Sequence, residues 1–507
     1  MRLNILIGGK AGQGINKVSE IVSNTLGNFG YFTFNYRDYQ SLIRGGHNFN
    51  VLSISEEQIE SHETKMNIIV ALDERTLKTH KQALKKDGQI ITSEQFENEG
   101  RNLNITLAGA LIKILGIPLT ELENEIKSQF KKSEEAIISA KKGFDSQENK
   151  FSLKKLKNKI SILSGSEAVA IGARNSGLDL YIAYPMTPAT NAMHELAKNQ
   201  IEDNLMAFQA ESEIAAANMA LGASFSGAKT MTGTSGGGFD LMGEALSLQG
   251  ISEIPLTVYL ASRPGPGTGV PTYTAQADLD IALRAGHGEF PRFVIAPGNA
   301  TETIEKTSEA LFLAEKFKTL SIILGDKHLA ESEFSSNKKP AKTPKFKISR
   351  KIPGESITKA ASYEVDTSGN STESYSITEK NVNARVAKYE KSKQFINDNF
   401  GMIKIHGNKN SKNLIIGWGS TSGAIKDAIK NLDAKFLQVL YCKPLSNQIR
   451  KEMEKANNII LVEENVTGQL GRLLREKTGI KIENRLLKYN GRPFHSDELK
   501  KYIEEIL

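Results

Sequence analysis

The sequence predicts an α/β protein made of three α/β domains. Three observations lead to this prediction. A chain of 507 residues is too long for one hydrophobic core, so about three domains are expected. Short apolar runs alternate with helical patterns, and glycine or proline follows most of the runs. The composition, with 39% hydrophobic and 24% charged residues, is typical of an ordinary globular protein.

The first predicted domain, residues 1–158, has the pattern of a strand, a helix and a second strand, followed by further strand and helix patterns. Its apolar runs lie at residues 3–8, 31–36, 66–72 and 89–92. A helical pattern separates the first two runs, and the tail after residue 119 is helical. This alternation indicates a Rossmann-like unit.

A glycine cluster, GGKAGQG at residues 8–14, lies where the first predicted strand turns into a helix. Backbone N–H groups around Gly9, Gly12 and Gly14 suit an anion at such a turn. The residues match neither a phosphate-binding Walker loop nor a clean GxGxxG, although Asp38 lies roughly where a ribose-binding acid would. A dinucleotide, another phosphate-bearing ligand and a purely structural turn therefore all stay open.

A second glycine-punctuated segment, SLIRGGHNF at residues 41–49, is predicted to be a loop. Arg44 and His47 are its candidates for contact with a phosphate. A surface arginine and a packed histidine are the equally plausible alternative.

The second predicted domain spans residues 159–333, with strands expected at residues 179–184, 229–232, 256–261 and 292–296. In YPMTPAT, Thr187 comes directly after the first of these strands, where open α/β sheets bind ligands. Pro188 is predicted to take the first helical position. The competing interpretation of Thr187 is a helix N-cap.

Two charged side chains stand out later in the same domain. Glu213 opens the small-residue helix of ESEIAAANMALGAS, where a carboxylate commonly offsets the helix dipole. Arg263 begins SRPGPGTGVPT, whose prolines and glycines make a stiff, shaped loop. A guanidinium held there suits a carboxylate, and a surface ion pair is the alternative.

The remainder of the chain is predicted as a linker or insertion over residues 334–405 and a third α/β domain over residues 406–507. Strands are expected at residues 413–417, 436–440 and 458–463. Seven basic residues and no acidic one lie at residues 335–351, and a solvated linker is favoured over nucleic-acid binding.

The cysteine count and the N-terminus indicate the compartment. The single cysteine, Cys442, excludes an intrachain disulfide and any cluster ligated by this chain's cysteines alone. The N-terminal segment has the pattern of neither a signal peptide nor a membrane span. We therefore expect a cytoplasmic protein with neither membrane nor nucleic-acid partners.

Several of these motifs together resemble one family, the 2-oxoacid:ferredoxin oxidoreductases, and specifically an alpha subunit with a fused gamma domain. Thr187 in YPMTP, Glu213 in SEIAAA and Arg263 in SRPGPGTGVPT resemble its thiamine-diphosphate pyrimidine-binding domain. GGKAGQGI and SLIRGGHNF resemble its gamma domain, and GHGEFPR matches another segment of the same family. VEENVTGQLGRLL at residues 462–474 resembles its transketolase-C-terminal-like domain.

The resemblance implies roles for individual residues. Glu213 would be catalytic, through a hydrogen bond to the aminopyrimidine ring of thiamine diphosphate. Arg263 and Thr187 would hold the 2-oxoacid, with Thr272 as a weaker candidate for substrate contact. The cofactor would also contact Tyr184 and Pro185.

The resemblance also implies a reaction and partners. The reaction is oxidative decarboxylation of a 2-oxoacid, with 2-oxoglutarate favoured and pyruvate and branched 2-oxoacids open, giving acyl-coenzyme A, CO₂ and reduced ferredoxin. No metal ligand is expected on this chain, because a beta subunit would supply the diphosphate site, Mg²⁺ and a [4Fe–4S] cluster in an αβ or α₂β₂ assembly. LGDKH at residues 324–328 is a poor substitute for that diphosphate motif.

Two alternatives remain at this point. One is a subunit of a transketolase-type or pyruvate-dehydrogenase-type thiamine-diphosphate enzyme. The other is a non-catalytic nucleotide-binding module.

Overall fold

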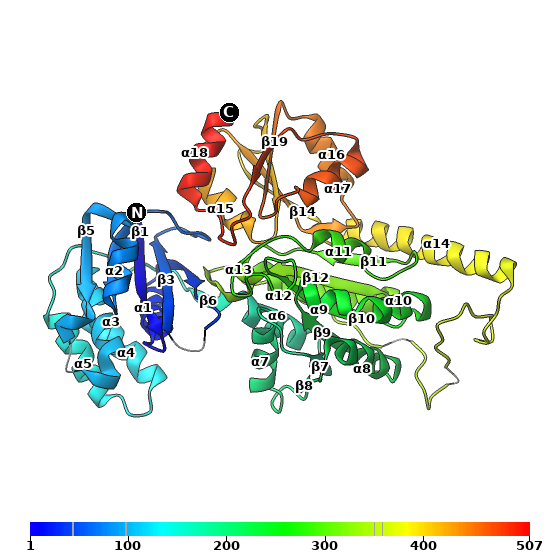
Figure 1. The fold of residues 1–507 in the computed structure, drawn as a ribbon, viewed down its shortest axis with the longest axis horizontal. Coiled ribbons are helices and arrows are strands. Elements are labelled where there is room, and N and C mark those ends of the chain that lie inside the picture. The colour runs from blue at the N-terminus through cyan, green and yellow to red at the C-terminus, as the bar shows by residue number, and fades with distance from the viewer. Residues whose placement is uncertain (43–44, 97–98, 349, 357) are drawn as a thin grey trace. The chain divides into compact units, whose positions relative to one another are not determined.

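The computed structural model describes residues 1–42, 45–96, 99–348, 350–356 and 358–507. These residues form three mixed β-sheets with helices between their strands, which confirms the predicted α/β class (Figure 1). The chain divides into two compact units. The first comprises Met1–Ser164, Glu331–Lys339 and His495–Lys501, and the second comprises Gly165–Ala330, Pro340–Phe494 and Tyr502–Leu507. The boundaries expected at residues 158, 333 and 405 stay predictions.

The first unit is built on a sheet with the strand order β5-β4-β1-β3-β2-β13-β6. The strands are β5 (Leu84–Thr92), β4 (Met66–Ala71), β1 (Arg2–Ala11), β3 (Gly45–Ser55), β2 (Phe32–Asp38), β13 (Glu333–Ser336) and β6 (Ser161–Ser164). The helices are α1 (Ile15–Asn28), α2 (Glu74–His80), α3 (Leu103–Ile114), α4 (Leu119–Gln129) and α5 (Glu134–Asp145). Val18, Ile21 and Val22, at helical spacing on α1, lie in the core between these layers.

The prediction of a loop over residues 41–49 is wrong for residues 45–49, which belong to strand β3. It pairs antiparallel with β1 on one side and with β2 on the other. The strand signal is weak in the sequence because buried polar residues interrupt the apolar ones. Asn50 donates a hydrogen bond to Ser19 at 2.7 Å, and Ser53 donates one to Asn4 at 2.6 Å. These bonds satisfy the buried polar groups, so the strand tolerates them.

The second unit contains a sheet with the strand order β17-β11-β12-β10-β9-β7-β8, in which all neighbours are parallel except β17. Its strands are β7 (Leu180–Ala183), β8 (Met206–Gln209), β9 (Thr230–Thr234), β10 (Leu256–Ser262), β11 (Arg292–Ile295), β12 (Leu320–Asp326) and β17 (Tyr441–Lys443). Every residue of β10 is buried, as expected of a central parallel strand covered on both faces.

The helices of this sheet differ in length, from 5 to 18 residues. They are α6 (Gly165–Asn175), α7 (Thr190–Lys198), α8 (Glu213–Phe225), α9 (Gly236–Leu241), α10 (Gly243–Ser252), α11 (Leu279–Arg284), α12 (Ala300–Phe317) and α13 (Lys327–Glu331). On α8, Ala216, Ala217 and Ala220 are buried. Their small side chains let this helix lie close to its neighbours.

A third sheet, with the strand order β14-β16-β15-β18-β19, belongs to the same unit. Its elements are β14 (Ile403–Gly407), β15 (Asn413–Trp418), β16 (Lys435–Val439), β18 (Asn458–Glu463), β19 (Asn484–Leu487), α15 (Thr421–Ala428), α16 (Asn447–Glu454) and α17 (Gln469–Thr478). The last helix, α18 (Ser496–Ile506), has its first residues in the first unit and its last residues in the second. The segment after β16 enters the second sheet as β17, and one hydrophobic core includes residues of both sheets.

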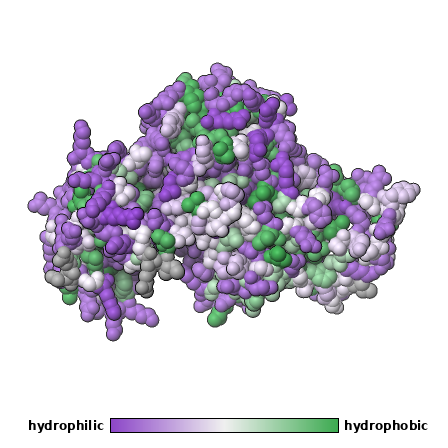
Figure 2. Space-filling view, in the orientation of Figure 1, coloured by the Kyte–Doolittle hydropathy of each residue, from purple (hydrophilic) through white to green (hydrophobic). Residues whose placement is uncertain are grey.

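The predicted linker or insertion contains helix α14 (Tyr375–Asn399), drawn in yellow in Figure 1. Sequence periodicity does not indicate this helix, because only Ser392 and Ile396 are buried along its length. The face of the molecule drawn in Figure 2 is mostly hydrophilic, with scattered apolar patches. Among the described residues, no helix combines the length and apolar character needed to cross a membrane.

Candidate active site

The candidate site lies at the carboxyl ends of four neighbouring parallel strands. Tyr184 and Pro185 follow β7, Glu213 comes shortly after β8, Gly236 follows β9, and Arg263 follows β10. Parallel strands present these ends at one edge of the sheet, which is where open α/β sheets bind ligands.

Glu213 is held at the first turn of α8 by local capping and close packing. The Ser212 side chain caps the helix by accepting a hydrogen bond from the Ala215 N–H at 3.2 Å. The Glu213 side chain is 4% exposed, and within the described residues its Oε1 has no hydrogen-bond partner. A β-carbon added at Gly238 would lie 2.7 Å from that oxygen, so the carboxyl rests against the backbone of α9. A buried carboxyl in this state is suited to receive a polar group of a ligand.

The structure brings Arg263 and Thr187 together, as their predicted shared role requires. Arg263 Nη1 donates a hydrogen bond to the Thr187 carbonyl oxygen at 2.9 Å. Burial lowers the pKa of the Arg263 guanidinium, and Asp278 and Glu213 lie near enough to oppose that shift. The guanidinium therefore lies within electrostatic range of two carboxyl groups and keeps further N–H donors for an anion.

Two expectations around Thr187 are wrong. Helix α7 begins at Thr190 with Ala189 as its N-cap, so Pro188 does not occupy the first helical position and Thr187 is not the cap. The reason is a turn before the helix, closed by the Thr190 N–H donating to the Met186 carbonyl oxygen at 3.2 Å.

Tyr184, Pro185 and Thr272 have different degrees of exposure. Tyr184 is 38% exposed, Pro185 is partly buried, and Thr272 is 5% exposed on the loop that begins at Arg263. Their contacts with cofactor or substrate stay predictions.

Sequence reasoning missed Asp278, at the far end of the Arg263 loop. Burial raises the pKa of its carboxyl to about 6, while Ser262 and Arg263 lower it and Asp240 raises it. The only signal in the sequence is an acid at the end of a glycine- and proline-rich loop. Nothing in the sequence shows that this acid lies within electrostatic range of the arginine at the start of the loop.

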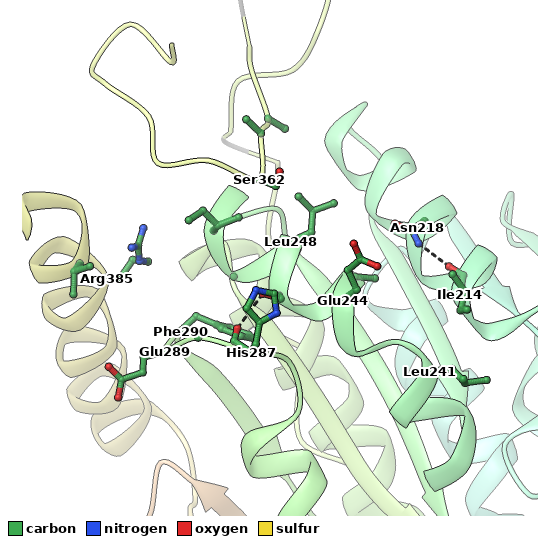
Figure 3. A pocket seen from close by; sticks show the side chains of 18 residues that line it. Ile214, Asn218, Leu241, Glu244, Leu248, His287, Glu289, Phe290, Ser362 and Arg385 are labelled. Carbon is green, nitrogen blue, oxygen red and sulfur yellow. Dashed lines mark hydrogen bonds between the residues drawn. The ribbon is translucent and has the colours of Figure 1, made fainter. Parts of the chain in front are cut away.

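A pocket of about 840 Å³ lies beside α8, and Figure 3 shows its lining. Ile214 and Asn218 of α8 form one side, and Arg385 of α14 faces them from the other. Ile214 and Leu241 are 52% and 54% exposed. Exposed apolar side chains beside a ligand site commonly mark a surface that a partner covers.

The N-terminal glycine cluster forms a tight turn between β1 and α1. Gly9 lies within β1, while Gly12 and Gly14 have φ angles of 90° and 80°, which favour glycine. Within the turn, Gln13 Oε1 accepts a hydrogen bond from the Lys10 N–H at 2.6 Å. Arg44, the predicted anion contact, lies outside the described residues. The ligand of this loop stays a prediction.

His47 lies in β3 and pairs with another histidine. Its Nε2 is 2.8 Å from the Nε2 of His80, and the side chain is buried. Burial and the neighbouring His47 lower the pKa of His80 to about 4, and burial also lowers that of His47. His47 is therefore a packed histidine paired with His80, and its contact with a phosphate stays a prediction.

Asp326, the acid of LGDKH, has hydrogen-bond partners within the protein. Asp326, in LGDKH, accepts hydrogen bonds from Ser420 Oγ at 2.5 Å and from the Leu329 N–H at 2.9 Å. Within the described part of the chain, no group of three or more histidine, cysteine, aspartate or glutamate side chains is arranged to hold a metal ion.

Comparison with known proteins agrees with this geometry. Residues 171–395 match the family model for the thiamine-diphosphate-binding part of pyruvate flavodoxin/ferredoxin oxidoreductase, and residues 4–101 match the model for pyruvate ferredoxin/flavodoxin oxidoreductase. A 2-oxoacid:ferredoxin oxidoreductase alpha subunit from Sulfolobus is 31% identical, over 100% of this chain and 97% of that protein.

Two further proteins similar to this chain are named for 2-oxoglutarate. A 2-oxoglutarate oxidoreductase subunit KorA from Mycobacterium tuberculosis is 31% identical over 68% of this chain and 57% of that one. The solved structure of 2-oxoglutarate:ferredoxin oxidoreductase from Magnetococcus marinus superposes with a TM-score of 0.90 at 25% identity, covering 99% of both chains. The matches to the Sulfolobus subunit and to the Magnetococcus structure cover nearly all of the chain, and they favour this family over the transketolase-type and non-catalytic alternatives. The chain belongs to the alpha subunits of the 2-oxoacid:ferredoxin oxidoreductases, which are multi-subunit enzymes.

Proposed function

We propose that this chain supplies one half of a thiamine-diphosphate site that oxidatively decarboxylates a 2-oxoacid, with 2-oxoglutarate as the favoured substrate. Coenzyme A would take the acyl group, and ferredoxin would receive the electrons. A beta subunit would complete the site in an αβ or α₂β₂ assembly.

The observation that carries this proposal is the state of Glu213. Its carboxyl is buried, is fixed at the start of α8, and has an oxygen without a partner in the described structure. A carboxyl of this kind suits the ring nitrogen of an aminopyrimidine, because it can share or donate a proton in a site that excludes water. Gly238 allows the carboxyl to lie there, since any β-carbon at that position would collide with it. The residues present therefore fit the cofactor.

When bound, thiamine diphosphate supplies the electron sink that decarboxylation requires. Glu213 would hold a proton at the pyrimidine ring nitrogen. Arg263 would bind the substrate carboxylate through N–H donors other than the one that Thr187 occupies. The substrate would thus be oriented by a guanidinium that is itself anchored, and orientation accounts for much of the rate enhancement in such sites.

Other components of the proposed reaction would come from a partner. The chain contains one cysteine, and Cys442 is buried, so four thiolates for a [4Fe–4S] cluster must be supplied by another chain. Mg²⁺ and the diphosphate-binding motif are assigned to the same beta subunit. The exposed Ile214 and Leu241, close to Glu213 and Gly238 in the sequence, support the placement of that partner on the surface beside α8.

The choice of 2-oxoglutarate and coenzyme A rests on relatives. The solved Magnetococcus enzyme has 2-oxoglutarate, coenzyme A and succinyl-coenzyme A bound, and KorA proteins carry 2-oxoglutarate in their names. The fused gamma and alpha layout and the RPGPGTG loop support the same choice as associations of the family.

One assay tests the proposal. The chain is co-expressed with a beta subunit, and viologen reduction is followed with coenzyme A and with 2-oxoglutarate, pyruvate or a branched 2-oxoacid in turn. We expect the highest kcat/KM with 2-oxoglutarate. Equal values for pyruvate and 2-oxoglutarate would overturn the substrate assignment, and absence of activity with every 2-oxoacid would overturn the enzymatic proposal. Activity of the isolated chain would contradict the half-site.

A further inference from the structure

The carboxyl group of Asp278 rests against α9, the short helix that the Glu213 carboxyl also contacts. A β-carbon added at Gly236 would lie 2.6 Å from Asp278 Oδ2 and 2.7 Å from Oδ1, just as one at Gly238 would meet Glu213. Asp278 and Glu213 therefore both approach the first turn of α9, at Gly236 and Gly238 respectively. Arg263 is within electrostatic range of both.

Asp278 does not perform the structural role that its position offers. It is the N-cap residue of α11, where an aspartate normally accepts a hydrogen bond from the first turn of the helix. No such bond from its side chain is made, and its Oδ2 is buried without a partner in the described residues. A buried carboxyl oxygen left unpaired is costly, so this oxygen is suited to accept a hydrogen bond from a ligand or to carry a proton toward one.

The groups that face Asp278 set its charge. From the end of β10 and the loop that follows, Ser262 and Arg263 favour the ionised carboxyl, while Asp240 on α9 opposes it. Burial is the largest influence and favours the protonated form. On α11 itself, Asp280 is engaged by Arg472 of α17 and by Arg284. Asp278 is thus the acid of this segment that responds to a change of charge at Arg263.

We propose that Asp278 is a positioning residue that controls how a substrate carboxylate binds Arg263. This inference rests on the proposed function, in which Arg263 holds that carboxylate. Ionised Asp278 competes with the substrate for the guanidinium and repels the incoming negative charge. Protonated Asp278 removes the competition and offers an O–H donor beside the anion.

A consequence is that substrate binding takes up a proton. The incoming carboxylate makes ionisation of Asp278 less favourable, so a proton from solvent joins Asp278 as the substrate binds. Burial raises the pKa of Asp278 to about 6 before the substrate binds. Binding of the 2-oxoacid is therefore expected to weaken as the pH rises above that value. For uptake of one proton, the limiting dependence is about a tenfold rise in KM per pH unit.

The test measures KM and kcat of the reconstituted complex from pH 5.5 to 8.5, in the wild type and in Asp278→Asn. We expect the wild-type KM for the 2-oxoacid to rise with pH, and the Asn variant to show a flat profile and a lower KM at pH 8. Asp280→Asn is the matched control, since Asp280 is already engaged by arginines, and it should keep the wild-type slope. An unchanged slope in Asp278→Asn would refute the inference.

Two further measurements keep the test decisive. Calorimetric titration of the substrate in buffers of different ionisation enthalpy reports proton uptake without turnover, and uptake equal in Asp278→Asn and wild type would refute the inference. If Asp278→Asn does not fold, Gly236→Ala displaces the carboxyl instead, with Gly237→Ala as its control because open space surrounds that position. A wild-type complex that oxidises no 2-oxoacid would overturn the proposed function, whereas an active complex with a pH slope independent of Asp278 would overturn this inference alone.

Discussion

Replacing Gly238 with alanine tests whether the placement of Glu213 matters for activity. The added methyl group would lie 2.7 Å from both Glu213 Cγ and Oε1 and would meet Thr234 Oγ1 even more closely. Ordinary carbon contacts are about 3.5 to 4.0 Å, so these atoms must move apart by about 1 Å. Thr234 has a short side chain on a buried strand, so we expect the longer Glu213 side chain to make the larger shift.

Two magnitudes follow from that displacement. Overpacking of this size costs about 1 to 3 kcal/mol of stability. A catalytic group displaced by about 1 Å costs about 100-fold in rate. Neither cost arises at Gly237, where a β-carbon has nothing within 4 Å, and alanine there is expected to be neutral or to stabilise the short helix slightly.

The assay compares kcat of the reconstituted complexes and the thermal unfolding of the isolated chains. We expect Gly238→Ala to fold with a modestly lower midpoint and to lose about 100-fold in kcat. Gly237→Ala should retain both. Full activity of Gly238→Ala, or equal losses in the two variants, would refute the assignment of Glu213 to the reacting site.

Three further predictions concern the site, its partner surface and pH. Glu213→Gln should lower kcat by about 10²- to 10⁴-fold while the complex still forms, as gel filtration with activity assays would show; activity within a fewfold of wild type would contradict its role. Ile214→Lys and Leu241→Lys should weaken association with the beta subunit by about tenfold or more. Val466→Lys, at a site 61% exposed, should leave the affinity unchanged, as a titration of labelled chain would show. Equal affinities of all three variants would contradict the placement of the interface beside α8. Burial and nearby Asp326 raise the pKa of Glu464 from its ordinary 4.5 to about 8, so its contribution to stability is complete below about pH 4.5 and is lost as the pH rises through 8. Unfolding midpoints of Glu464→Gln should therefore fall less between pH 5 and 9 than those of wild type, and parallel curves would contradict this.

Sequence patterns predict this fold well where an element has a single clear periodicity. Strand β10 is a continuous apolar run because it is buried on both faces, and α1 places Val18, Ile21 and Val22 on its core side. Sequence patterns fail where buried positions carry polar residues, or where most of a helix is exposed. Strand β3 is obscured by buried Asn50 and Ser53, and α14 is obscured because most of it faces solvent.

The residues of the candidate site could be predicted from the sequence, but their contacts with one another could not. Glu213, Thr187 and Arg263 stand out in the sequence because each follows a strand or opens a helix in a shaped segment. Their meeting is a tertiary fact, since the hydrogen bond from Arg263 to the Thr187 carbonyl joins segments far apart in the chain. Pro188 was misplaced because the turn before α7 depends on a backbone hydrogen bond that composition does not reveal.

By itself, the sequence determined the α/β class, the family resemblance and the residue types that carry chemistry, because these follow from local periodicity and from short motifs. Only the tertiary structure decided that Glu213 is buried with an unpaired oxygen, that His47 pairs with His80, and that Asp278 lies within electrostatic range of Arg263. The physical reason is that burial, pairing and charge depend on which side chains approach from other elements. Such approaches join residues that no local pattern connects.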